Sequence, residues 1–389
     1  MTNLLSSKVN SVLVFTFGAL LTINGFAYFA HFSSVLATLA WLSPLALASL
    51  AGLSIALSFI ENQIFSKTAR LLAVLVLVAG CLPFVFKPPF AGNPTNWALT
   101  HFAFALSLLV MPRIDRGAYL ALLKWLLVAS TFSLVFGSAA ISVDSRSWLI
   151  GGRLTGVFGH PNVTGMAAIA CVVLCIWLKE TKTLFFVNAC LVVVLSLSLT
   201  SLVALSAALL IWLLKSQRAK KLVTVSLAAA TLIPIVLTFA IGLHIDESLF
   251  TGRAGVWWIL AHFDTPVLSG FGPGFIQSLL DGGDIPWFHA HDEIIMEYVS
   301  GGVPMLLTGI AVIFALAIKA NRKSDGLAQA VAVAFFVYAI TEVPLFLDNT
   351  LARLPLAFIM LGTILAQSNP AEQMPVAARK RQSEQTRLV

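Results

Sequence analysis

The sequence predicts an all-α integral membrane protein with about twelve transmembrane helices. Of its 389 residues, 59% are hydrophobic and only 11% are charged, whereas a soluble domain has about 25% charged residues. The apolar residues form long uninterrupted runs, which is typical of helices surrounded by lipid. The alternating segments of about ten residues that build a membrane β-barrel are not found in the sequence.

Polar breaks divide these apolar runs into the individual spans. The first run is longer than the core of a signal peptide and lacks a cleavage site, so we expect it to remain as a span. The run 183–214 is too long for one straight span, and its serine- and threonine-rich stretch 196–201 is expected to form a turn. The expected spans are 11–31, 34–60, 68–86, 97–111, 118–141, 158–178, 183–198, 201–214, 222–243, 296–318, 327–347 and 351–367.

The distribution of lysine and arginine orients these spans. With the N-terminus in the cytoplasm, 19 of the 24 basic residues fall in cytoplasmic segments and five fall outside. Cytoplasmic loops of membrane proteins are enriched in Lys and Arg, so this split predicts that both termini are cytoplasmic. The five basic residues predicted outside are Lys87, Arg146, Arg153, Arg253 and Arg353.

The spans group into five regions. The longest connection is expected on the extracytoplasmic, or periplasmic, side between spans nine and ten, and it is too long for a simple link. The regions are 1–150 with the first five spans, 151–243 with spans six to nine, the loop 244–295, 296–367 with the last three spans, and the cytoplasmic tail 368–389.

The net charge of +7 marks this topology and does not indicate a nucleic-acid partner. The four cysteines lie inside apolar runs, where they are expected to be buried small side chains. They are Cys81, Cys171, Cys175 and Cys190.

Two of the external arginines stand in glycine-rich motifs. Arg153 follows Gly151-Gly152, and Arg253 follows Gly252. A guanidinium keeps its charge and binds phosphate through a planar fork of donors. Such groups at the outer membrane interface suit a lipid-linked diphosphate, while the alternative is that they contact lipid headgroups.

The end of the long loop holds a cluster of titratable side chains. His289, His291, Asp292 and Glu293 lie just before the tenth span, so His291 or Asp292 should stand near a helix N-terminus. Histidine has the pKa best suited to a general base near neutral pH, and a carboxylate would fix its tautomer. His-x-His with acidic neighbours also matches part of a metal site, although the sequence specifies no third ligand.

Glu342 lies inside the eleventh span, towards its outer end. An ionisable residue within a membrane segment indicates function, and its expected partner is Arg353 or a group of the outer loop. Gly270-Phe-Gly272 is not preceded by a strand, so it predicts a turn and not a dinucleotide-binding motif.

These motifs resemble the O-antigen ligase and polymerase superfamily of bacterial membrane glycosyltransferases, which includes Wzy-type polymerases and protein O-oligosaccharyltransferases. The detailed resemblance covers about 150–305. It is carried by Arg153-Leu-Thr-Gly156 with Gly159-His160-Pro161-Asn162, by Gly252-Arg253 with Trp257, Pro266 and Gly270-Phe-Gly272, and by His289-Ala-His291-Asp292-Glu293 with Gly301-Gly302.

The resemblance implies a GT-C-like protein of the bacterial inner membrane that uses no cofactor and no metal. Its donor would be a glycan on undecaprenyl diphosphate, and its reaction would invert the anomeric centre in lipopolysaccharide or surface polysaccharide biosynthesis. Arg253 would stabilise the departing diphosphate, and His291 would accept the proton of the acceptor hydroxyl. The residues expected to bind the lipid diphosphate or the glycan are Arg153, Arg253, Asn162, His289, Asp292, Glu293 and Trp257.

Two positions depart from the family pattern. Ser201-Leu202-Val203 stands where the family often has Ser-Arg-Gly, so a second phosphate-binding arginine is missing there. Asp292 stands where the family has asparagine, which replaces an amide donor by an acceptor. Arg153 is a candidate to replace the missing arginine.

Several functions remain open within and beyond this family. A ligase would use a lipid A–core acceptor, a polymerase another lipid-linked repeat, and an oligosaccharyltransferase a protein hydroxyl group. A transporter or flippase would need charges and broken helices near the membrane midplane. Because the ionisable residues collect at the outer edge, the sequence favours the transferase.

Overall fold

The computed structural model describes residues 67–86, 88–90, 149–150, 153–154, 161–178, 183–243, 252–272, 274–285, 290–322 and 326–342, with scattered positions between 98 and 131. Helices dominate these residues, which confirms the predicted helical class. The expected spans 11–31, 34–60 and 351–367 lie outside the described residues.

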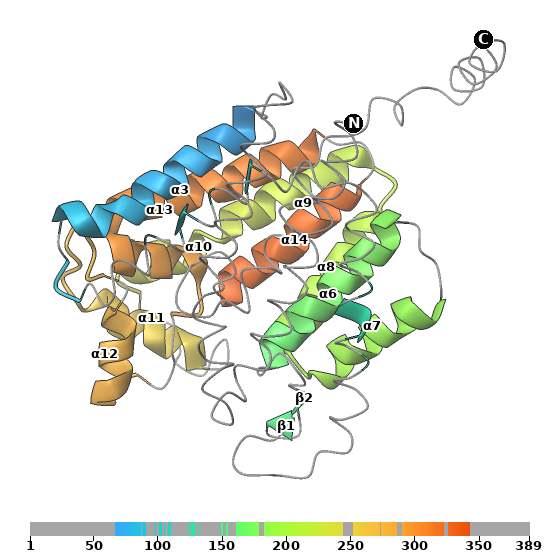
Figure 1. The fold of residues 1–389 in the computed structure, drawn as a ribbon, viewed down its shortest axis with the longest axis horizontal. Coiled ribbons are helices and arrows are strands. Elements are labelled where there is room, and N and C mark those ends of the chain that lie inside the picture. The colour runs from blue at the N-terminus through green and yellow to red at the C-terminus, as the bar shows by residue number, and fades with distance from the viewer. Residues whose placement is uncertain are drawn as a thin grey trace, which may run out of the picture.

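Most of the helices run in roughly the same direction and form a bundle (Figure 1). They are α3 (Lys67–Phe86), α6 (Pro161–Leu178), α7 (Thr183–Leu195), α8 (Leu199–Leu213), α9 (Gln217–Ala230), α10 (Ile233–Ile235), the π-helix η4 (Val236–Ala240), α11 (Arg253–Ala261), α12 (Phe275–Gly282), α13 (Glu293–Asn321) and α14 (Leu327–Thr341). Two short strands, β1 (Leu149–Ile150) and β2 (Arg153–Leu154), pair antiparallel.

Two helical stretches among the described residues are long and apolar enough to cross a membrane. They are Gln217–Ala240, which joins α9 to η4, and α13. About 20 apolar residues are needed to cross the hydrocarbon core. The first stretch begins five residues before the predicted span 222–243, because the Ser216 hydroxyl accepts the Ala219 N–H at 3.3 Å and caps the helix.

The turn predicted within 183–214 is confirmed. Helix α7 ends at Leu195, and α8 begins at Leu199. Ser198 caps α8, because its hydroxyl accepts the Ser201 N–H at 3.2 Å. The Ser196 hydroxyl donates to the Val193 carbonyl at 2.7 Å, so the serine side chains bond to backbone groups of the turn and its flanking helices.

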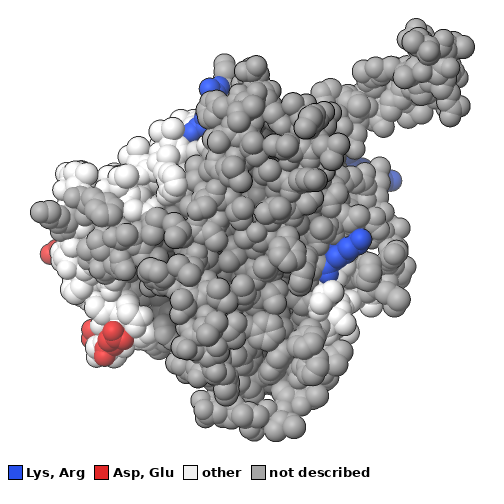
Figure 2. All heavy atoms as spheres, in the orientation of Figure 1, with Lys and Arg blue, Asp and Glu red and all other residues white. Residues whose placement is uncertain are grey.

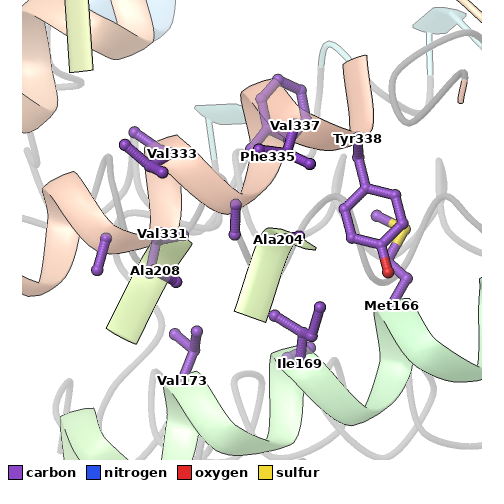
Figure 3. Close-up of a cluster of buried hydrophobic side chains, with 14 of the residues drawn as sticks. Met166, Ile169, Val173, Ala204, Ala208, Val331, Val333, Phe335, Val337 and Tyr338 are labelled. Carbon is purple, nitrogen blue, oxygen red and sulfur yellow. The ribbon is translucent and has the colours of Figure 1, made fainter. Parts of the chain in front are cut away.

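Helix α14 lies at the centre of the bundle and packs against α8, α9, α13 and α6. All of its residues from Leu327 to Ala339 are buried. Figure 3 shows Met166 and Ile169 of α6, Ala204 of α8 and Phe335 and Tyr338 of α14 in one apolar cluster. Small residues such as alanine let helix backbones approach closely, which is how apolar helices associate in a membrane.

The charged residues of the described surface gather at different ends of the bundle. Figure 2 shows Asp and Glu over α12 and Lys and Arg near the start of α3. Asp281 and Asp284 are exposed at the first place, and Arg70 is exposed at the second. On this face the acidic side chains therefore lie apart from the basic ones.

Helix α13 is not one straight helix. Its backbone is non-helical at Gly302, where φ is 67° and ψ is −159°. A Cβ atom on Gly309 would lie 3.1 Å from Cγ of Glu297, although 12 residues of straight helix span about 18 Å. The segment before the break therefore folds back against the segment after it, which the sequence analysis did not predict.

The predicted turn at Gly270-Phe-Gly272 is confirmed, and it fills the break in α13. The Phe271 N–H donates to the Val299 carbonyl at 2.8 Å, and the Val303 N–H donates to the Val267 carbonyl at 2.7 Å. A Cβ atom on Gly270, whose φ is 58°, would lie 2.5 Å from the Gly301 nitrogen. Glycine is thus required at 270 both for its backbone angle and for the close approach.

Candidate functional site

The carboxylate of Glu342 joins three separate parts of the chain. Glu342 follows the last turn of α14, where its extended backbone ends the helix and its side chain is buried. Oε1 accepts a hydrogen bond from Arg253 Nη2 at 2.7 Å and another from Asn162 Nδ2. Oε2 lies 3.6 Å from Nδ1 of His291. Arg253, Asn162 and His291, which were predicted for the site, thus meet at Glu342.

Arg253 is the first residue of α11 and follows Gly252, whose φ is 88°. A positive charge is unfavourable at a helix N-terminus, because the helix dipole is positive there. Its position therefore does not serve the stability of α11. The ion pair with Glu342 neutralises it in this structure.

Arg153 reaches the same group of residues from β2. Its Nη2 donates to Oδ1 of Asn162 at 3.0 Å, and its Nε donates to the Ser196 carbonyl at 3.2 Å. Burial lowers the pKa of Arg153, the Glu342 carboxylate opposes this, and the Arg253 charge adds to it. Arginine nevertheless stays charged, so two guanidinium groups interact with one carboxylate.

The contact with Ser196 places Arg153 at the turn between α7 and α8. This turn lies just before Leu202, a position at which the superfamily that the motifs resemble often has arginine. The structure thus brings a guanidinium from β2 to the region in which the sequence analysis noted a missing arginine.

His291 stands immediately before the first residues of α13, as predicted. It adopts a left-handed backbone with φ of 54°, which is uncommon for a residue other than glycine. The neighbouring Ala290 carbonyl accepts the indole N–H of Trp257 at 2.7 Å. Strained backbone of this kind persists only where the surroundings hold it, and it clusters at functional sites.

Trp257 was predicted to contact substrate, but it is only 1% exposed. Its indole ring lies in the core on α11, and its N–H holds the backbone next to His291. This hydrogen bond therefore positions the backbone just before His291. His289 and Arg353 lie outside the described residues.

Asp292 caps α13, because Oδ1 accepts the Ile295 N–H at 2.8 Å. Its other oxygen is buried and has no hydrogen-bond partner among the described residues. Burial raises the pKa of Asp292 well above its usual value, against the opposing hydrogen bond from Ile295, and the charge of Glu293 raises it further. A raised pKa favours the protonated acid, which carries a hydrogen-bond donor.

Glu293 and Glu297 form a second buried acidic pair one turn apart on α13. Their carboxyl groups are hydrogen-bonded to each other. The sequence analysis assigned Glu293 to the substrate site but did not predict its pairing with Glu297.

Among the described residues, no group of three or more His, Cys, Asp or Glu side chains is placed to hold a metal ion. Arg253, Asn162 and His291 meet at the Glu342 carboxylate, and Arg153 joins the group through Asn162. The chain matches no protein-family model and no curated protein. The functional interpretation therefore rests on these residues and their geometry.

The buried carboxyl group of Asp292 predicts how the stability of the protein changes with pH. Because its folded-state pKa is raised, its ionisation destabilises the native state, so stability is lost as pH rises from about 4 through the folded pKa. Asp292→Asn keeps the cap without the charge and should lack this loss. Asp292→Ala should lower stability by about 1 kcal/mol through loss of the cap.

Thermal unfolding in detergent, measured from about pH 5 to 8, tests this difference. The gap in melting temperature between wild type and Asp292→Asn should shift in favour of the asparagine variant as pH rises. If the melting temperatures of wild type and Asp292→Asn differ by the same amount at every pH, Asp292 does not titrate in the way that its burial implies.

Proposed function

We propose that this protein is a membrane glycosyltransferase of the O-antigen ligase type. It transfers a glycan from undecaprenyl diphosphate to an acceptor at the outer face of the bacterial cytoplasmic membrane. The observation that carries the proposal is the convergence of Arg253, Arg153 and His291 on the buried Glu342.

The proposed topology has about twelve spans with both termini in the cytoplasm, in a GT-C-like arrangement. The loop 244–295 and the site then face the periplasm. The separation of acidic α12 from the basic start of α3 supports this orientation, because positive charge favours the cytoplasmic side (Figure 2). The two helical stretches long enough to span support the membrane location.

The two arginines suit a leaving group with more than one negative charge. Glu342 supplies a single charge against two guanidinium groups, so the site keeps a positive balance for an incoming anion. When the bond between the anomeric carbon and the diphosphate oxygen breaks, the oxygen leaves with the electron pair. Guanidinium groups already in position stabilise this developing charge without reorganising.

In this proposal His291 accepts the proton of the acceptor hydroxyl, and its contact with Glu342 supports the role. Its Nδ1 faces Oε2 of Glu342 at 3.6 Å. A proton on Nδ1 would leave Nε2 as the acceptor, and a carboxylate stabilises the imidazolium that forms. The acceptor oxygen then forms its new bond to the anomeric carbon as its proton passes to His291.

A transporter is the competing class, and the break in α13 is the feature that would favour it. However, the backbone groups at Val299, Ser300 and Val303 are hydrogen-bonded by residues 267–272. They are therefore not presented to a cargo. The charged groups of Arg253 and Glu342 meet at the end of α14, and not midway along it. This position favours a reaction on a bound substrate over transport of a cargo through the helix bundle.

The acceptor distinguishes the ligase from its relatives. A lipid A–core sugar, a lipid-linked repeat and a protein serine or threonine each offer a hydroxyl group to the same base. We propose the ligase first, and a polymerase or a protein O-oligosaccharyltransferase as alternatives. A transfer assay should therefore offer all three acceptors with one undecaprenyl-diphosphate donor.

Replacement of Arg253 tests the anion site. Arg253→Ala should lower glycan transfer by about 10²–10³-fold, the typical cost of losing one donor to a developing oxyanion. Arg253→Lys should recover little, because an ammonium cannot reproduce the planar fork. Arg322→Ala at the end of α13 is the matched control, since Arg322 is exposed and far along the chain from the site. Full activity of Arg253→Lys would contradict bidentate binding.

Replacement of His291 tests the base. His291→Ala should lower the transfer rate by about 10²–10⁴-fold, while the donor still binds because both arginines remain. His289→Ala should have a milder effect. His262→Ala is the matched control, because this exposed histidine bonds to the Trp258 carbonyl outside the site. If His291→Ala keeps more than about a tenth of the wild-type rate, His291 is not the base.

A further inference from the structure

Exposed apolar side chains lie in the long loop 244–295 and just after α3. Val267 and Leu268 are 61% and 55% exposed, and Phe263 and Phe90 are also partly exposed. We call these four residues the apolar edge. Exposed apolar side chains in a contiguous patch mark a site of contact with a protein, a ligand or a membrane.

The apolar edge is held rigidly and does not belong to a loose loop. The Phe90 N–H donates to the Phe271 carbonyl at 2.7 Å, and the Gly274 N–H donates to the Phe90 carbonyl at 2.8 Å. The rings of Phe263 and Phe90 pack against Phe275, with centroids 5.2 and 5.3 Å apart. These contacts fix the edge to the end of α3.

The same segment is hydrogen-bonded to α13 at its break. Val267 accepts the Val303 N–H, which belongs to the long part of α13 after Gly302. Val267 and Leu268 therefore lie beside the first residues of this apolar helical segment, at the same height along its axis. In the proposed topology this end lies at the outer face of the membrane.

An apolar stripe on α3 leads to the edge. Leu71, Val74, Val78 and Val85 are all about half exposed or more, and their spacing of three, four and seven residues places them on one helix face. Helix α3 lies beside α13 and packs against it (Figure 1). A stripe of this kind on a membrane helix faces lipid, and the edge continues it beyond Phe86.

We propose that the apolar edge inserts into the outer leaflet, where Phe263, Val267 and Leu268 contact lipid acyl chains. Its occupant is membrane lipid, because the edge continues a lipid-facing stripe and lies level with the end of an apolar helix. The inference depends on α3 and α13 crossing the membrane and does not require the transferase reaction.

The insertion has a consequence for the site. Helix α11 runs from Arg253 to Ala261, and the edge begins two residues later at Phe263. Nine helical residues span about 13 Å. The edge therefore anchors one end of a short rigid helix in the lipid, and the other end holds Arg253 at a fixed distance from the membrane. This is the placement that a lipid-linked anion requires.

Spin labels at single cysteines test the insertion. The four native cysteines are first replaced by alanine, and the background variant must elute and melt as wild type does. Val267→Cys and Leu268→Cys are then labelled in the full chain and reconstituted in phosphatidylethanolamine–phosphatidylglycerol vesicles. Collision with oxygen reports the hydrocarbon region, and collision with a water-soluble nickel complex reports water.

Labels at 267 and 268 should collide with oxygen more than with nickel, as a label at Leu307→Cys should. Leu307 is an exposed residue in the long part of α13 and serves as the lipid control. Labels at Asp281→Cys and Asp284→Cys on or beside α12 should show the opposite preference. Nickel-dominated collisions at 267 and 268 with oxygen-dominated collisions at 307 would overturn the insertion alone. Nickel-dominated collisions at 307 as well would overturn it together with the spanning role of α13.

Discussion

The buried carboxylate of Glu342 is the group on which the rest of the site depends. A buried carboxylate is costly unless it is paired and hydrogen-bonded. Here the partners come from Arg253 on α11, Asn162 on α6 and His291 before α13. Removing this one charge would therefore loosen three elements at once. It would also leave the charges of Arg253 and Arg153 without the carboxylate that offsets them.

The fold delivers Glu342 to this place through α14. That helix is buried along most of its length, so its end is fixed by contacts on every side. The buried hydrogen bond between the hydroxyl groups of Tyr338 and Ser201, 2.6 Å long, joins α14 to α8 one turn before Glu342. The same α7–α8 region receives Arg153. Glu342 and Arg153 thus share one rigid support.

Some of this arrangement could be predicted from the sequence and some could not. Local signals gave the helical class, the turn at Ser196–Ser198 and the position of His291 before a helix, because each depends on neighbouring residues. The partner of Glu342 was expected to be Arg353 or an outer-loop group, and the structure identifies Arg253 of that loop. The contact between Asn162 and Glu342 joins residues 180 positions apart, and the fold-back of α13 depends on packing against residues 267–272. Neither leaves a local pattern, since Gly301-Gly302 and Pro304 indicate only that the helix is weakened there.

In the proposed reaction, Glu342 holds Arg253 in the donor-free site and serves His291 during transfer. Steady-state kinetics of Glu342→Gln with an undecaprenyl-diphosphate-linked glycan test it most directly, because glutamine keeps the size and the hydrogen-bonding capacity but not the charge. KM for the donor should fall or stay unchanged, since no carboxylate competes for Arg253. In contrast, kcat should fall by about 10²-fold or more, since the base loses its partner. A variant with a raised KM and an unchanged kcat would contradict it, because Glu342 would then assist donor binding and play no part in the proton transfer.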